Sequence, residues 1–231
     1  MKNRWEIWLG LVGFLMFAGA HYMGLFISPA DAMMGDVGRI LYAHVPTAWV
    51  GLLTYLVAFI AAIGAMITGR AAWDAMVEAS VEVGLLLNAL LLIQGSLWAK
   101  PTWGVYWTWD PRLTTCAIMV VAFGVVLALR RQIDDPQRRL TLSSVATIIA
   151  FVNVPIVYMS VKWWRTLHQN FSSPETVDRM MVIPLRIAAF GMLFIATAFV
   201  VRRWRIALST LRLDFEAPDL PETPTPLTVE D

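Results

Sequence analysis

"VGLLLNALLLIQGSLWAKPTWGVYWTWDPRLTTCAIMVVAFGVVLAL", residues 83–129, contains two long apolar runs on either side of a loop rich in tryptophan. Each run approaches the roughly 17–25 apolar residues that a helix needs to cross the hydrocarbon of a bilayer. Similar runs continue along the 231-residue chain, and we expect six spans: 7–27, 45–68, 83–99, 113–129, 140–161 and 184–201. The pattern predicts an all-α, polytopic integral membrane protein built as a six-helix bundle.

The composition agrees with this fold class. Hydrophobic residues make up 58% of the chain and charged residues 15%, whereas a soluble domain is about half apolar and about a quarter charged. The net charge of +1 says nothing about partners. The basic residues suit topology signals better than a nucleic-acid patch, so we expect membrane lipid and no nucleic acid as partners. Because Cys116 is the single cysteine, the chain has no internal disulfide and no CxxC motif for thiol–disulfide chemistry.

Domain organisation follows from the same pattern. We expect residues 1–213 to form one transmembrane domain, and its first apolar run to be retained as a helix rather than removed as a signal peptide. The segment 214–231 is acidic and rich in proline, so we expect a disordered tail.

The distribution of Lys and Arg predicts the orientation. With both termini in the cytoplasm, eleven of the 18 basic residues lie inside and seven outside, and the most basic segments, 130–139 and 202–212, both lie inside. Three connections then face outward, at residues 28–44, 99–112 and 162–183. The tryptophan-rich loop is the middle one.

Two of the three histidines lie in the other outward connections. His44 is in "LYAHVPTAW" and His168 is in "KWWRTLHQNF". Haem iron takes axial nitrogen ligands, and two histidines on one side of the membrane would suffice for one haem. The alternative is that both are solvated loop residues. His21 lies inside the first span, where an ionisable residue is itself a functional candidate, and spacing alone does not rank the three.

The tryptophans admit two interpretations. Indole rings gather at membrane–water interfaces, which accounts for Trp5, Trp8, Trp49, Trp73 and Trp204 without a ligand. In the loop, Trp103 and Trp107 are four residues apart. A short amphipathic helical segment between Pro101 and Pro111 would place both rings on one face, with Trp109 projecting elsewhere. Such a face suits a large planar ligand.

Three charged residues near these features also have two interpretations each. Asp110 precedes Pro111 and an apolar run, so it suits the N-cap of the next helix, and it equally suits orienting a histidine or a ligand edge. Arg112 and Arg39 face outward and are candidates for pairing with the two carboxylates of haem. The alternative for each arginine is an interfacial cation with its stem along the apolar surface.

Three segments together resemble a known family. "WGVYWTWD" at 103–110 matches the WGxxWxWD signature of the tryptophan-rich (WWD) haem-handling proteins of cytochrome c biogenesis. "RILYAHVPTAW" at 39–49 and "WWRTLHQ" at 163–169 resemble the histidine segments of one branch, cytochrome c maturation protein C, the haem exporter protein C type. The resemblance covers nearly the whole chain except the acidic tail.

The resemblance implies a set of site residues. His44 and His168 would be the axial ligands of haem b, while His21 matches no ligand of the family. A binding surface would consist of Trp103, Trp107, Trp109 and Asp110, with Trp98 beside them. The propionate role of Arg39 and Arg112 is our own hypothesis.

The resemblance also implies a function at the periplasmic face of the bacterial inner membrane. Haem would be presented there for covalent attachment to a haem chaperone, maturation protein E, beside an ABC transporter of maturation proteins A and B with the small membrane protein D. The chain has no Walker sequence, so we expect ATP use to belong to a partner. We expect no acid–base catalytic centre, because holding haem in position is sufficient.

Two other functions remain open from the sequence. A haem-translocating subunit of an ABC-type exporter would need polar residues along its spans; Glu82, Asn88, Gln94 and Asn153 exist but form no stripe. A purely structural subunit would use its tryptophans only to anchor the loop in lipid.

Overall fold

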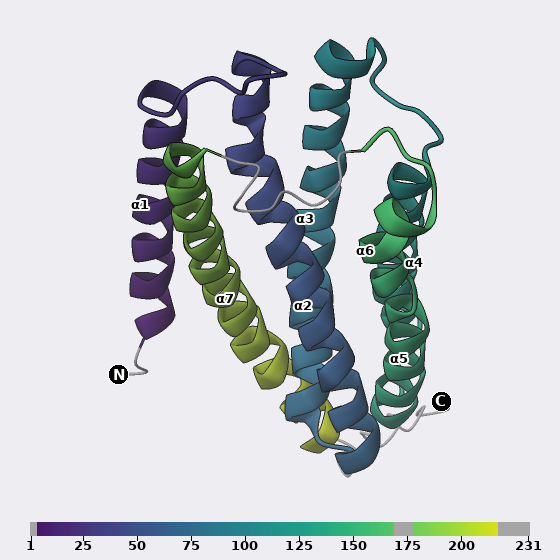
Figure 1. Ribbon diagram of the computed structural model, residues 1–231. Coiled ribbons are helices and arrows are strands. Elements are labelled where there is room, and N and C mark those ends of the chain that lie inside the picture. Colours follow the sequence, from purple (N-terminus) through teal and green to yellow (C-terminus); the bar gives the residue numbers. More distant parts are fainter. Residues whose placement is uncertain (1–3, 169–177, 217–231) are drawn as a thin grey trace, which may run out of the picture.

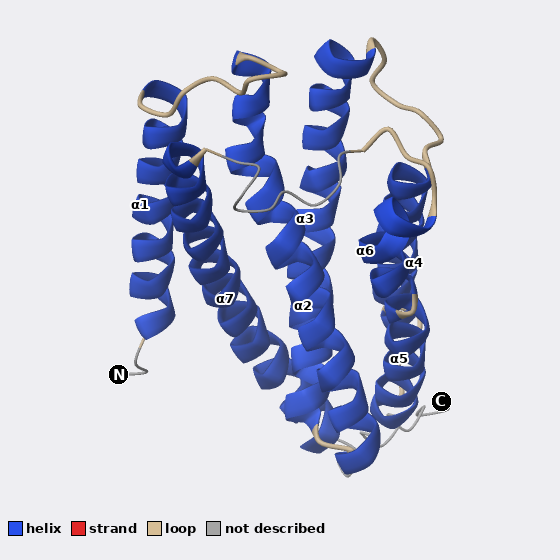
Figure 2. Ribbon diagram, in the orientation of Figure 1, coloured by secondary structure: helices blue, strands red, loops and turns tan. Residues whose placement is uncertain are grey.

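The computed structural model describes residues 4–168 and 178–216, and these residues are almost entirely helical (Figures 1 and 2). In chain order the elements are α1 (Trp5–Phe26), the 3-10 helix η1 (Asp36–Ile40), α2 (Leu41–Thr68), α3 (Ala71–Trp103), α4 (Pro111–Arg130), α5 (Pro136–Phe151), α6 (Asn153–Trp163) and α7 (Arg179–Glu216). Within the described residues, six helical spans are long and apolar enough to cross a membrane, with α5 and α6 together forming the fifth. The expected all-α bundle with six spans is confirmed.

The connections lie at two opposite ends of the bundle. Figure 1 shows the α1–α2 and α3–α4 loops at one end, together with the end of α6 and the start of α7. We call this the tryptophan end, after residues 103–110. The short α2–α3 and α4–α5 turns lie at the other end, which we call the arginine end, after residues 130–139. Of the expected tail, residues 217–231 lie outside the described part of the chain, and α7 continues to Glu216.

Local sequence explains where the helices begin and end. Both α4 and α5 start at an Asp-Pro pair: the aspartate side chain accepts a backbone N–H of the first turn, and proline occupies the first helical position. At the other ends, α2 and α3 stop where Gly69 and Gly104 adopt φ of 61° and 80°. Glycine takes this left-handed conformation without the steric cost that a Cβ imposes.

The fifth span is broken in the middle. The sequence predicts one helix over 140–161, but the chain turns at Val152 between α5 and α6. Pro155 explains the break, because it has no N–H for the carbonyl of Phe151 and its ring crowds that carbonyl. The side-chain amide of Asn153 donates to the carbonyl of Thr115 at 2.7 Å, which ties the break to α4.

The middle of the bundle is filled by aromatic and aliphatic side chains. The rings of Tyr55 on α2 and Phe123 on α4 stack with centroids 3.6 Å apart, and both side chains are fully buried. Met119 belongs to the same buried cluster. These buried side chains fill the space between α2 and α4 in the middle of the bundle, as in other close-packed interiors.

Ion pairs hold the arginine end together. Arg130 at the end of α4 donates to both carboxylate oxygens of Asp74, at 2.6 and 3.1 Å, and to Glu78 at 2.9 Å. Arg203 on α7 pairs with Glu82. Helix α3 begins at Ala71, before the expected span from residue 83, and it carries these acids at the arginine end.

Candidate functional site

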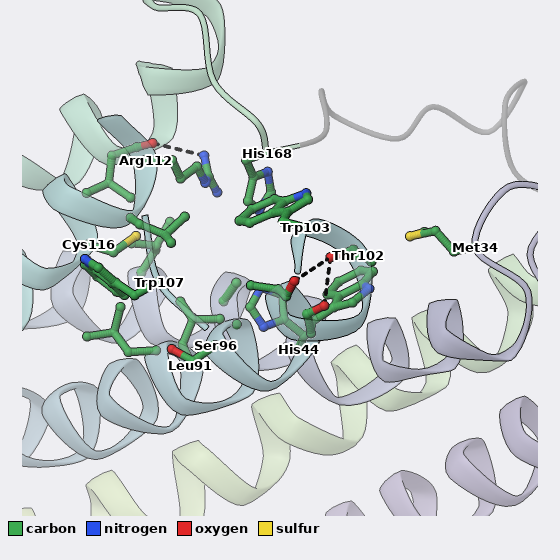
Figure 3. A pocket seen from close by; sticks show the side chains of 18 residues that line it. Met34, His44, Leu91, Ser96, Thr102, Trp103, Trp107, Arg112, Cys116 and His168 are labelled. Carbon is green, nitrogen blue, oxygen red and sulfur yellow. Dashed lines mark hydrogen bonds between the residues drawn. The ribbon is translucent and has the colours of Figure 1, made fainter. Parts of the chain in front are cut away.

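A cavity of about 240 Å³ lies at the tryptophan end, between the helices α2, α3, α4 and α6. Figure 3 shows the side chains that surround it, and most of them are apolar. The residues of this cavity that the sequence analysis singled out as site residues are His44, Trp98, Trp103, Trp107, Arg112 and His168. Segments more than 120 residues apart thus contribute to one cavity.

His44 lies in the first turn of α2, directly after η1. Its ring meets the ring of Trp98 edge-on, with centroids 5.4 Å apart, and the imidazole lies close to Gly95 on α3. Among the described residues its buried Nδ1 has no hydrogen-bond partner. A buried polar atom without a partner carries a free-energy cost, so it points to a ligand at this position.

His168 reaches the cavity from the segment that follows α6. This segment leaves the helix at Trp164, whose backbone is extended. The backbone N–H of His168 donates to Oγ1 of Thr166 at 3.1 Å. The structure therefore brings His44 and His168 to one cavity from two elements that are distant in sequence.

The third histidine does not take part. Nδ1 of His21 donates to the carbonyl of Phe17 at 2.8 Å, one turn earlier on α1, and its ring packs against the Phe17 ring. His21 does not line the cavity. Of the three histidines that spacing did not rank, His44 and His168 line the cavity.

The tryptophan-rich loop differs from the expected helical turn. Helix α3 continues through Pro101 to Trp103 and ends at Gly104, and residues 104–110 are not helical. The expectation failed because the left-handed Gly104 stops the helix between the two rings. Trp103 and Trp107 nevertheless both line the cavity.

Trp109 lies outside the cavity. Its side chain is 80% exposed, and its ring meets Trp107 edge-on with centroids 5.8 Å apart. Asp110 does not line the cavity either. It is buried at the N-cap of α4, where its Oδ1 accepts the backbone N–H of Arg112 at 3.0 Å. The capping role considered for Asp110 is therefore present.

The two arginine candidates have different positions. Arg112 lines the cavity and donates from Nη1 to the carbonyl of Val157 at 3.0 Å. The structure does not bring Arg39 there. Its Nε donates to Asp36 at 2.8 Å and its Nη1 donates to the carbonyls of Gly24 and Ser28, so that it joins η1 to the end of α1. An anionic ligand in the cavity would thus meet Arg112.

Comparison with known proteins identifies the family of the chain. The family model described as "Heme exporter protein C" matches residues 1–217, almost the whole chain. The chain belongs to the heme exporter protein C family. Membership of this family implies a role in haem handling for cytochrome c biogenesis. Together with the six spans, it also implies a multi-pass protein of the inner membrane.

Individual members of the heme exporter protein C family are similar over most of their length. The chain is 33% identical to Heme exporter protein C of Bradyrhizobium diazoefficiens over 211 residues, which cover 89% of this chain and 80% of the relative. It is 31% identical to Heme exporter protein C of Escherichia coli K12 over 199 residues, covering 86% and 81%. The relative from Haemophilus influenzae is 34% identical over 199 residues, covering 84% and 80%.

Several residues that line the cavity were not predicted from the sequence. Met34 reaches it from the first loop at the tryptophan end, and its backbone N–H is held by Asp31 Oδ1 at 2.8 Å (Figure 3). Thr102 and Cys116 also line it. No motif marked these positions, because a methionine in a loop and a cysteine in an apolar run are indistinguishable from packing residues without the fold.

Proposed function

We propose that the chain binds haem b at the periplasmic end of the bundle and presents it for covalent attachment to the haem chaperone, maturation protein E. The observation that carries the proposal is that His44 and His168 line one cavity with Trp98, Trp103 and Trp107. Haem is the cargo here. The cavity suits it because the Nδ1 of His44 is buried there without a partner among the described residues, and the remaining lining is mostly apolar.

Each group has a role that its chemistry supports. His44 and His168 ligate the iron axially. The indole rings of Trp103 and Trp107 contact the flat porphyrin and exclude water from it. Arg112 offers a guanidinium to a propionate, a geometry that a planar fork matches well. In this arrangement one edge of the ring would have to stay open to the chaperone.

Catalysis by this site is positional. Holding two reactants in the correct geometry lowers a barrier by about 7–11 kcal/mol in favourable cases, because a bimolecular encounter becomes effectively unimolecular. The chain needs no acid–base group of its own for this role. ATP hydrolysis belongs to the ABC transporter subunits, maturation proteins A and B, which we propose as partners together with the small membrane protein D.

The packing of the core argues against the alternative of a haem conduit through the bundle. Three of the four polar residues considered for a conduit have partners: Asn88 donates to the carbonyl of Gly84 at 2.8 Å, Asn153 donates to the carbonyl of Thr115 at 2.7 Å, and Glu82 pairs with Arg203. The buried Oε1 of Gln94 has no hydrogen-bond partner among the described residues. Between the two ends, the fully buried stack of Tyr55 on Phe123 fills the interior.

An absorption spectrum of the purified protein tests the proposal. We expect the spectrum of low-spin haem with two histidine ligands. His44→Ala and His168→Ala should each lose it, whereas the matched control His21→Ala should keep it, because His21 lies outside the cavity. Variants that retain the full spectrum but fail to transfer haem to the chaperone would instead favour a conduit.

A further inference from the structure

Within the described part of the chain, the carboxylate of Asp110 accepts three hydrogen bonds, and one of these belongs to the helix that it caps. Besides the N–H of Arg112, its Oδ1 accepts the hydroxyl of Thr166 at 2.6 Å and its Oδ2 accepts the backbone N–H of Leu167 at 2.7 Å. Both additional donors lie more than 50 residues further along the chain. The side chain is 7% exposed, so these bonds form in surroundings with little water.

Thr166 links the carboxylate of Asp110 to His168 through two hydrogen bonds. Its Oγ1 donates to Asp110 and accepts the backbone N–H of His168 at 3.1 Å. The chain from residue 164 to residue 168 is not helical, and it therefore lacks the regular backbone bonds that would fix it. The carboxylate of Asp110 provides this fixation, with hydrogen bonds to a charged acceptor that are stronger than neutral ones.

We propose that Asp110 is a positioning residue: it acts on haem through His168, not by touching haem. The inference rests on the proposed function. Asp110 does not line the cavity, and its bonded oxygens face the N-terminus of α4 and the segment of His168. Asp110 thus caps α4, which carries Arg112. The same side chain positions the segment that carries His168, the second proposed iron ligand. The tryptophan motif and the histidine segment form a single unit.

Loss of the Asp110 contact should weaken the binding of haem iron, because it would leave the His168 ring less well oriented. Groups that orient a metal-ligating histidine change metal affinity by about 10–100-fold when they are replaced. We expect the same range for loss of the Asp110 contact. His44 is held by α2 and is independent of it, so one axial ligand should remain when the contact is broken.

Asp110→Asn separates capping from positioning. Asparagine is as good an N-cap as aspartate, but its NH2 group cannot accept the N–H of Leu167 and it carries no charge. We expect Asp110→Asn to bind haem about 10–100-fold more weakly and to show the five-coordinate spectrum of His168→Ala. Added imidazole should restore the six-coordinate spectrum in both variants, because it replaces the missing ligand.

Two further variants keep the test independent of folding. Thr166→Val removes the hydroxyl without touching the cap and should shift the spectrum in the same direction. Asp135→Asn is the matched control, since Asp135 also precedes a proline and caps α5, with Oδ1 accepting the N–H of Arg138 at 2.6 Å at the arginine end. It should leave the haem spectrum unchanged.

A double variant gives the decisive outcome. If Asp110 acts through His168, Asp110→Asn combined with His168→Ala should bind haem no more weakly than His168→Ala alone, because coupled sites are not additive. A fully additive loss, or an Asp110→Asn protein with the wild-type spectrum and affinity, would overturn the inference. A wild-type protein without a two-histidine spectrum would refute the proposed function itself, which is a different result.

Discussion

Trp107 and Trp109 are two residues apart and carry the same ring, yet the structure gives them different surroundings. Trp107 lines the cavity, while Trp109 is 80% exposed. Aromatic contacts contribute about 0.5–1.5 kcal/mol beyond the area they bury. Trp107→Ala should therefore weaken haem binding by about 2–12-fold or more, measured by haem titration, and Trp109→Ala should have a clearly smaller effect.

This pair of variants also tests whether the tryptophans serve only to anchor the loop in lipid. An exposed ring is the better interfacial anchor, because its N–H reaches water while its body contacts lipid. If lipid anchoring were the whole role, Trp109→Ala would be the more harmful change and Trp107→Ala would leave haem content unaltered.

At the scale of the element, Gly104 determines how α3 joins the tryptophan-rich loop. Its φ of 80° is costly for any residue with a Cβ, by about 1–2 kcal/mol. Gly104→Ala should destabilise the protein by about this amount, measured as a lower thermal midpoint in detergent. It should also reduce haem binding, because Trp103 and Trp107 lie on either side of the turn.

Gly69 supplies a matched control for this element. It ends α2 with φ of 61°, and at neither glycine does an added Cβ meet another atom within 4 Å. Gly69→Ala should therefore lower the thermal midpoint to a similar extent and leave haem binding intact. Equal losses of haem binding in both variants would mean that general destabilisation, not the loop geometry, accounts for the effect.

For the whole molecule, the sequence predicted the helices well and their contacts poorly. Six apolar runs located six spans, since length and hydrophobicity suffice to recognise a membrane helix. The break at Val152 was missed although Pro155 signals it, because the apolar run continues across it. The position of Arg39 and the bonds from Asp110 to Thr166 depend on how distant segments pack, and no local pattern encodes that.

The candidate site was likewise predicted only in part from the sequence. The number of spans between them predicted that His44 and His168 lie at one end, and the family resemblance singled them out from His21. The structure brings both to one cavity. Met34 was missed because its place in the cavity depends on a loop held by Asp31. The topology and several wall residues were therefore predicted from the sequence, whereas wall residues that depend on loop packing were not.

The orientation of the whole bundle yields the last prediction. The arginines of 130–139 lie at the end opposite the cavity, so the positive-inside rule predicts that the cavity faces the periplasm. Two single-cysteine variants in a Cys116→Ser background test this orientation. Met33→Cys introduces a cysteine in the first loop at the tryptophan end, where Met33 is 95% exposed. A membrane-impermeant maleimide should label this cysteine in cells with a permeabilised outer membrane. Gln132→Cys, in the exposed α4–α5 turn, should react only after lysis. The reverse pattern would place both histidines at the cytoplasmic face and exclude delivery of haem to a periplasmic acceptor.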